Sequence, residues 1–177
     1  MKFHNITKDD MLNGDGLRVV LWVSGCSHYC EDCQNKITWD PNVGVDFDEK
    51  AKQEIFDELE KDYIKGITFS GGDPLYSSNV SDVLALAKEI RKEYPTKDIW
   101  LYTGYTLAQL LQDDSELGNL RKEVLNTIDV LVDGEFEKDN ADQNAHWVGS
   151  TNQNIIRNPL QCTTSTHRPS NVLPKPK

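Results

Sequence analysis

The sequence has no apolar run long enough to cross a membrane. Its longest such run, VVLWV (19–23), is far short of the roughly 20 apolar residues that a spanning helix needs. The opening residues, MKFHNITKDD, also lack the basic start and apolar core of a signal peptide. We therefore expect a cytoplasmic protein with no membrane partner, in a compartment where thiols stay reduced.

The sequence also has fewer basic than acidic residues. The 177 residues include 19 Lys and Arg against 29 Asp and Glu, which gives a formal net charge of −10. Such a surface repels a phosphate backbone, so we expect no nucleic-acid partner. The acidity is typical of a soluble surface, or of one that docks to a basic face of another protein.

Short β-rich runs alternate with helical stretches along a chain of single-domain length. The β-rich runs are 17–24, 67–70, 98–103, 129–134 and 152–158. The first helical stretch is 46–66, with Asp46 as its N-cap and Gly66 as its end. The second runs from about Ser78 to before Pro95. The third is 106–126, with a break near Gly118. This order predicts an α/β fold, a small open βα barrel with a mainly parallel sheet of about five strands. We expect one domain over 1–158 and a mobile tail over 159–177, which is rich in proline and small polar residues.

Three of the four cysteines lie within eight residues, directly after the first predicted strand. Cys26, Cys30 and Cys33 have the spacing C-x3-C-x2-C. Thiolates suit iron–sulfur clusters and zinc, and this loop can hold three corners of one cubane cluster. A zinc site completed by His28, His4 or Cys162 is the alternative, although structural zinc sites usually have a second paired unit, which is absent here. Within the loop, His28 and Tyr29 are expected to pack or face solvent rather than bind metal.

A second motif, FSGGDPL (69–75), follows the second predicted strand. Two successive glycines let the backbone approach a ligand closely, although the motif taken alone signals only a turn. Because ligands collect at the carboxyl ends of parallel strands, we expect this turn to lie beside the cysteine loop. Thr103 and Asp133 end the third and fourth predicted strands at the same edge.

The cysteine loop followed by the Gly-Gly-Asp turn resembles the radical S-adenosylmethionine superfamily. Within it, the chain resembles the activating proteins of anaerobic ribonucleotide reductases, through NGDGLRVVLWVSGC (13–26), CQNKITW (33–39), LYTGY (101–105), LVDGEFE (131–137) and GSTNQNII (149–156). The chain departs from that pattern at Asp32 and Gln34, where aromatic residues are common, and at Val148, where arginine is expected.

The resemblance implies one 4Fe–4S cluster held by Cys26, Cys30 and Cys33, with S-adenosylmethionine bound to the fourth iron. We expect cofactor contacts from Asp32, Cys33, Gln34, Ser70, Gly71, Gly72, Asp73, Thr103 and Asp133. No side chain is expected to act as a catalytic acid or base, because the cluster and S-adenosylmethionine carry the chemistry.

The resemblance also implies a reaction and its partners. An oxidoreductase of this kind cleaves S-adenosylmethionine reductively, and the 5′-deoxyadenosyl radical takes a hydrogen atom from a glycine of the anaerobic ribonucleoside-triphosphate reductase. We expect an electron donor of the flavodoxin or ferredoxin type, and a homodimer is allowed. Two alternatives stay open, an activase of another glycyl-radical enzyme such as pyruvate formate-lyase and a zinc-binding module without catalysis.

Overall fold

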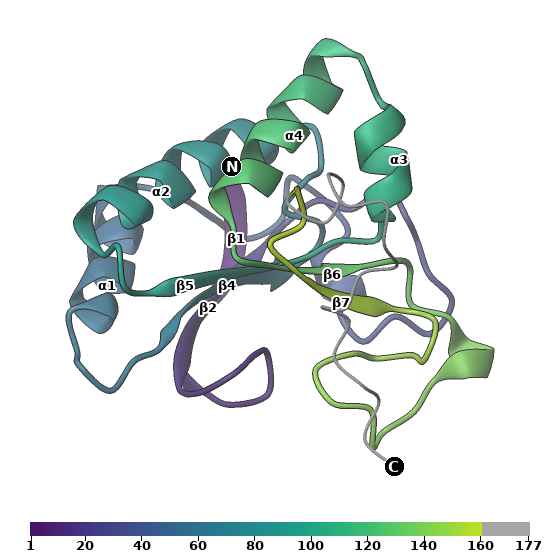
Figure 1. The fold of residues 1–177 in the computed structure, drawn as a ribbon, viewed down its shortest axis with the longest axis horizontal. Helices are drawn as coiled ribbons and strands as arrows, with labels where there is room; N and C mark the ends of the chain where they lie inside the picture. The colour runs from purple at the N-terminus through teal and green to yellow at the C-terminus, as the bar shows by residue number, and fades with distance from the viewer. Residues whose placement is uncertain (161–177) are drawn as a thin grey trace.

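A computed structural model of the chain describes residues 1–160 and contains one seven-stranded sheet in the order β3-β1-β2-β4-β5-β6-β7 (Figure 1). The strands are β1 (Lys2–Asp10), β2 (Arg18–Val23), β3 (Val45–Asp46), β4 (Gly66–Gly71), β5 (Asp98–Tyr102), β6 (Val130–Asp133) and β7 (Asn154–Arg157). The strands β2, β4, β5 and β6 are parallel to one another, whereas β1, β3 and β7 pair antiparallel toward the edges. Over these same residues, no helix is long and apolar enough to span a bilayer.

The predicted α/β class, the parallel centre of the sheet and five of its strands are confirmed. The prediction of about five strands is wrong by two, because β1 and β3 were missed. The sequence KFHNITKDD of β1 is mostly polar, and only Ile6 within it is buried. The two residues of β3 are both exposed, so neither strand carries the apolar pattern of a buried strand. The partial-barrel architecture stays a prediction.

Four helices lie on one face of the sheet (Figure 1). They are α1 (Glu49–Leu59), α2 (Val80–Glu93), α3 (Leu107–Gln112) and α4 (Glu116–Thr127), with short 3-10 turns η1 (Lys36–Thr38) and η2 (Lys138–Asn140). The order β2-β4-β5-β6 never reverses direction. Right-handed crossovers therefore place every connecting helix on the same side.

Both predicted boundaries of the first helix are wrong. The N-cap of α1 is Asp48 rather than Asp46, since the Asp48 carboxylate accepts hydrogen bonds from two backbone N–H groups of the first turn. The helix also ends at Leu59, and Gly66 belongs to β4. The break predicted near Gly118 lies three residues earlier, at 113–115, where Ser115 caps α4 and accepts a hydrogen bond from the Gly118 N–H.

The apolar core fills the space between the helices and the sheet, with fully buried side chains such as Leu21, Phe69 and Leu101 from the strands. On the opposite face, Trp100 and its neighbours Val130 and Val132 are covered by side chains of the β6–β7 loop (134–153). That loop therefore folds back over the sheet and brings its first residues to the carboxyl edge. The predicted domain limit at 158 stays a prediction, and residues 161–177, which form most of the predicted tail and include Cys162, lie outside the described part of the chain.

Candidate metal centre

The cysteine loop (24–35) leaves the carboxyl end of β2 with three half-buried free thiols, Cys26, Cys30 and Cys33. Backbone N–H groups hydrogen-bond to all three sulfurs. His28 and Tyr29 donate to Cys26, Phe136 donates to Cys30, and the Asn35 N–H lies 3.3 Å from the Cys33 sulfur. Such bonds stabilise thiolates and tune the clusters that thiolates hold.

Burial nevertheless opposes ionisation of two of these thiols. It raises the pKa of Cys26 to about 11, despite the two backbone hydrogen bonds to its sulfur. Burial also raises the pKa of Cys30. Thiolates at these positions need positive charge nearby, and bound iron would supply it.

The donor set fits a cluster better than a single ion. Among residues 1–160, no three Cys, His, Asp or Glu side chains converge closely enough to hold one metal ion. A cubane cluster takes one thiolate per iron and does not require such convergence. His28, named as a zinc ligand in the alternative, has both ring nitrogens in contact with carboxylates instead.

The Gly-Gly-Asp turn packs directly against the base of the cysteine loop, as predicted. The N–H of Gly72 donates to the carbonyl oxygen of Val23 at 2.8 Å, and the N–H of Asp73 donates to that of Gly25 at 2.8 Å. A Cβ added to Gly72 would lie 2.5 Å from the Gly25 carbonyl oxygen. Gly71 has a left-handed φ of +105°, and its added Cβ would lie 2.7 Å from the Val23 backbone. Both glycines are therefore needed for this close approach.

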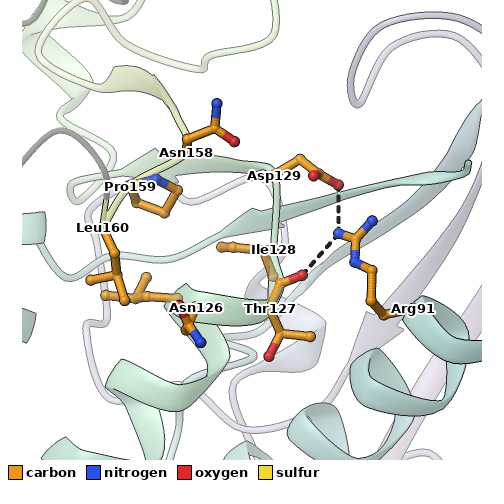
Figure 2. Close-up of a pocket in the computed structure, with 9 residues that line it drawn as sticks. Arg91, Asn126, Thr127, Ile128, Asp129, Asn158, Pro159 and Leu160 are labelled. Carbon is orange, nitrogen blue, oxygen red and sulfur yellow. Dashed lines mark hydrogen bonds and ion pairs between the residues drawn. The ribbon is translucent and has the colours of Figure 1, made fainter. Parts of the chain in front are cut away.

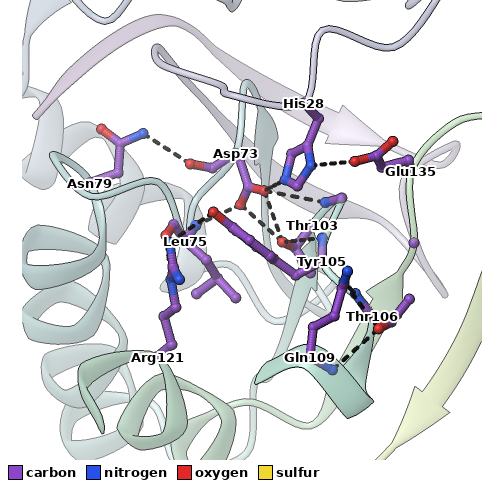
Figure 3. Close-up of polar contacts among 12 residues, drawn as sticks. His28, Asp73, Leu75, Asn79, Thr103, Tyr105, Thr106, Gln109, Arg121 and Glu135 are labelled. Carbon is purple, nitrogen blue, oxygen red and sulfur yellow. Dashed lines mark hydrogen bonds and ion pairs between the residues drawn. The ribbon is translucent and has the colours of Figure 1, made fainter. Parts of the chain in front are cut away.

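The carboxylate of Asp73 is buried and ties several loops together (Figure 3). It accepts hydrogen bonds from the hydroxyl of Thr103 at 2.9 and 3.0 Å, and from the N–H groups of Leu75 at 2.8 Å and Gly104 at 3.2 Å. It also lies 2.7 Å from Nε2 of His28. The ends of β4 and β5 and the cysteine loop thus meet at one carboxylate.

His28 is a member of this edge that the sequence did not identify. Its side chain is only 9% exposed, and its Nδ1 lies 2.9 Å from Oε1 of Glu135 (Figure 3). Burial lowers the pKa of His28, but the hydrogen bonds and charges of Asp73 and Glu135 outweigh burial and leave that pKa raised. A histidine between two cysteines of the motif, followed by an acid in the next motif, is the signal that could have indicated it.

The other predicted contact residues divide into buried and exposed groups. Asp133 is buried, and its carboxylate accepts from the Leu107 N–H at 2.7 Å and from the Asn154 amide at 2.9 Å, so it joins α3 and β7 to the end of β6. Ser70 is buried near the end of β4. Asp32 and Gln34 are exposed on the cysteine loop.

The β6–β7 loop forms ion pairs with exposed residues of the cysteine loop. Lys138 of this loop lies 2.7 Å from Asp32 and 2.9 Å from Glu31, and the hydrogen bond with Lys138 lowers the pKa of Asp32. Val148 packs with the cluster around Trp100. At that position the chain therefore uses an apolar contact in place of the expected arginine.

A pocket of about 190 Å³ lies at the opposite, amino-terminal edge of β6 (Figure 2). Its Arg91 donates to the Thr127 carbonyl oxygen at 2.9 Å and to the Asp129 carboxylate at 2.7 Å. The charged groups of this pocket are therefore paired with each other, and none of the predicted contact residues lines it.

Known proteins are similar in sequence to the chain over most of its length. The family model for a 4Fe–4S single cluster domain matches residues 12–156. A protein of Pasteurella multocida is 45% identical over 150 residues, which is 84% of this chain and 92% of its own. Proteins of Vibrio cholerae and Enterobacteria phage T4 are 43% and 39% identical over 159 and 158 residues, each covering 89% of this chain and 98% and 95% of their own. All three are named anaerobic ribonucleoside-triphosphate reductase-activating protein.

Proposed function

Because the chain belongs to the family of anaerobic ribonucleoside-triphosphate reductase-activating proteins, we propose that it activates such a reductase by radical chemistry. The predicted resemblance to these proteins is confirmed, and so is the presence of a 4Fe–4S domain.

Cys26, Cys30 and Cys33 are the proposed ligands of three irons of the cluster. Their free thiols and the N–H groups that reach each sulfur support this assignment. The fourth iron is left for S-adenosylmethionine.

The proposed position of S-adenosylmethionine is supported by one observation. The Gly-Gly-Asp turn packs on the cysteine loop through the Asp73–Gly25 hydrogen bond. The N–H groups of Gly72 and Asp73 are already used by Val23 and Gly25. The Gly72 carbonyl oxygen, by contrast, has no donor among the described residues. A carbonyl oxygen is what an ammonium group needs, so the turn is suited to accept the amino group of the methionine moiety.

Cys26, Cys30 and Cys33 would hold the cluster, which together with S-adenosylmethionine and one electron from the donor would supply the chemistry for abstracting a hydrogen atom from a glycine of the reductase. The chain itself provides the rigid edge on which these groups are aligned, through the buried carboxylates of Asp73 and Asp133. The sheet is open, so a glycine-bearing segment of the reductase can enter and help to exclude water.

The proposal includes a one-electron donor of the flavodoxin or ferredoxin type and a cytoplasmic location. A homodimer stays a prediction, which the molecular mass in solution would test. No side chain is assigned the role of a catalytic acid or base.

Anaerobic reconstitution tests the proposal. With iron, sulfide, a reductant and S-adenosylmethionine, the chain should release methionine and 5′-deoxyadenosine in equal amounts. A colourless protein that contains one zinc and no acid-labile sulfide would instead identify a zinc-binding module and overturn the proposal.

A further inference from the structure

His28 contacts three segments that follow three different strands. Its Nε2 lies 2.7 Å from the Asp73 carboxylate after β4, and its Nδ1 lies 2.9 Å from the Glu135 carboxylate after β6. Its ring meets the ring of Tyr105, after β5, edge to face with centroids 4.6 Å apart (Figure 3). The one side chain between Cys26 and Cys30 that turns inward thus fastens the cysteine loop to the rest of the carboxyl edge.

The surrounding chain makes room for this ring. A Cβ added to Gly104 would lie 2.5 Å from the imidazole, so only glycine fits at that position. The next residue along the loop, Tyr29, has a left-handed φ of +51°, which is uncommon for a residue other than glycine. Tyr29 is exposed, whereas the His28 side chain is only 9% exposed. The backbone reversal at Tyr29 therefore accompanies the inward placement of His28.

Asp73 depends on His28 for its charged contact. Its carboxylate is 1% exposed, and its other donors are the neutral hydroxyl and N–H groups of Thr103, Leu75 and Gly104. Among residues 1–160, His28 is the only basic side chain that contacts it. A buried carboxylate and a histidine at 2.7 Å form a stronger and more directional link than two neutral groups do.

We propose that His28 is a positioning residue that sets the placement of Cys26 and Cys30 relative to the Gly-Gly-Asp turn, and through it the alignment of cluster and S-adenosylmethionine. It is not a metal ligand, because both of its ring nitrogens are engaged by carboxylates. This inference rests on the proposed function, since it assumes that the cysteines hold the cluster and that the turn meets the methionine amino group.

The test compares His28→Phe, His28→Gln and the control Tyr29→Phe in the reconstituted full chain. Phenylalanine keeps a ring beside Tyr105 but loses both nitrogen contacts, and glutamine keeps a donor that can reach Asp73. The measurements are iron and sulfide content, and the S-adenosylmethionine concentration that half-saturates the change in the electron paramagnetic resonance spectrum of the reduced cluster.

A positioning role predicts that His28→Phe keeps its iron and sulfide but needs about tenfold more S-adenosylmethionine, as expected for the loss of a hydrogen bond to a charged group. His28→Gln should recover part of this loss, and Tyr29→Phe should match the parent. A folded His28→Phe variant that responds like the parent, or one that loses its iron, would overturn the inference.

If circular dichroism shows that His28→Phe does not fold, Glu135→Gln tests the positioning role instead. The Glu135 side chain is 54% exposed and tolerates the change. A half-saturating concentration raised about threefold supports the role, and an unchanged one overturns it. A parent chain with no cluster or no spectral response to S-adenosylmethionine would instead contradict the proposed function, so the two failures are distinguishable.

Discussion

The backbone N–H of Asp73 donates a hydrogen bond of 2.8 Å to the carbonyl oxygen of Gly25, the residue directly before Cys26. The two motifs that the sequence places one βα unit apart are therefore in direct contact. This contact fixes where a group bound by the cysteines would lie relative to the turn.

Gly72→Ala should break this contact. The added Cβ would lie 2.5 Å from the Gly25 carbonyl oxygen and 2.9 Å from that of Thr38, and neither backbone can yield easily. We expect the free energy of unfolding to fall by about 2 kcal/mol, as for other overpacked sites, and the reconstituted iron content to fall by about half or more. Chemical denaturation and iron analysis measure the two effects.

Gly16→Ala is the control, because Gly16 lies before β2 at the far edge, where its left-handed φ of +72° and an added Cβ 2.9 Å from Cβ of Lys65 also strain the backbone, but away from the cysteine loop. That variant should keep its iron. Equal iron content in Gly72→Ala and Gly16→Ala would contradict the role given to the turn.

Replacing any one of Cys26, Cys30 and Cys33 by alanine should abolish the 4Fe–4S cluster, because each is assigned to a separate iron. Cys162→Ala should retain it. Iron and acid-labile sulfide per chain, measured after anaerobic reconstitution, give the answer. Loss of the cluster in Cys162→Ala would show that a fourth thiolate takes the place assigned to S-adenosylmethionine.

Asp32→Ala and Gln34→Ala should change the dissociation constant for S-adenosylmethionine by less than about threefold. Both side chains are exposed, and Asp32 pairs with Lys138 and Lys36 rather than with groups of the buried edge. Any contact of residues 32–34 with the adenine would then come from the backbone. Equilibrium binding to the reconstituted protein measures the effect, and a loss of tenfold or more in Gln34→Ala would contradict this prediction.

Asp98→Ala should lower the free energy of unfolding by about 3 kcal/mol, because it leaves the guanidinium of Arg18 buried without its carboxylate. Arg18 is 0% exposed, and its Nη2 lies 2.5 Å from Oδ1 of Asp98. The matched control is Glu123→Ala, since Glu123 and Lys88 form a surface pair with both side chains 55% exposed. Denaturation of the control should show a change of about 1 kcal/mol or less, and equal losses in the two variants would refute the structural role of Arg18.

The sequence predicted the central strands and the meeting of the two motifs for one physical reason. Buried parallel strands are continuous apolar runs, and their carboxyl ends share one edge, so Cys26 and Gly72 had to approach each other. It did not predict β1, because a polar strand at the side of a sheet lacks the apolar pattern.

The contacts of His28 were also not predicted from the sequence. Its partners Asp73 and Glu135 are 45 and 107 residues away along the chain, and no periodicity links residues at such separations. Asp133 could be placed at the edge from the end of its strand, but its contacts with Leu107 and Asn154 became visible only in three dimensions.

Electron paramagnetic resonance of a candidate anaerobic ribonucleoside-triphosphate reductase, mixed with the reconstituted chain, decides whether the chain activates such a reductase. The account predicts a glycyl-type signal on the reductase that appears only when the chain, S-adenosylmethionine and a reductant are all present. The same signal should be absent with the Cys30→Ala variant. A reductase that stays silent with the complete mixture, while a pyruvate formate-lyase type enzyme acquires the signal, would contradict the account.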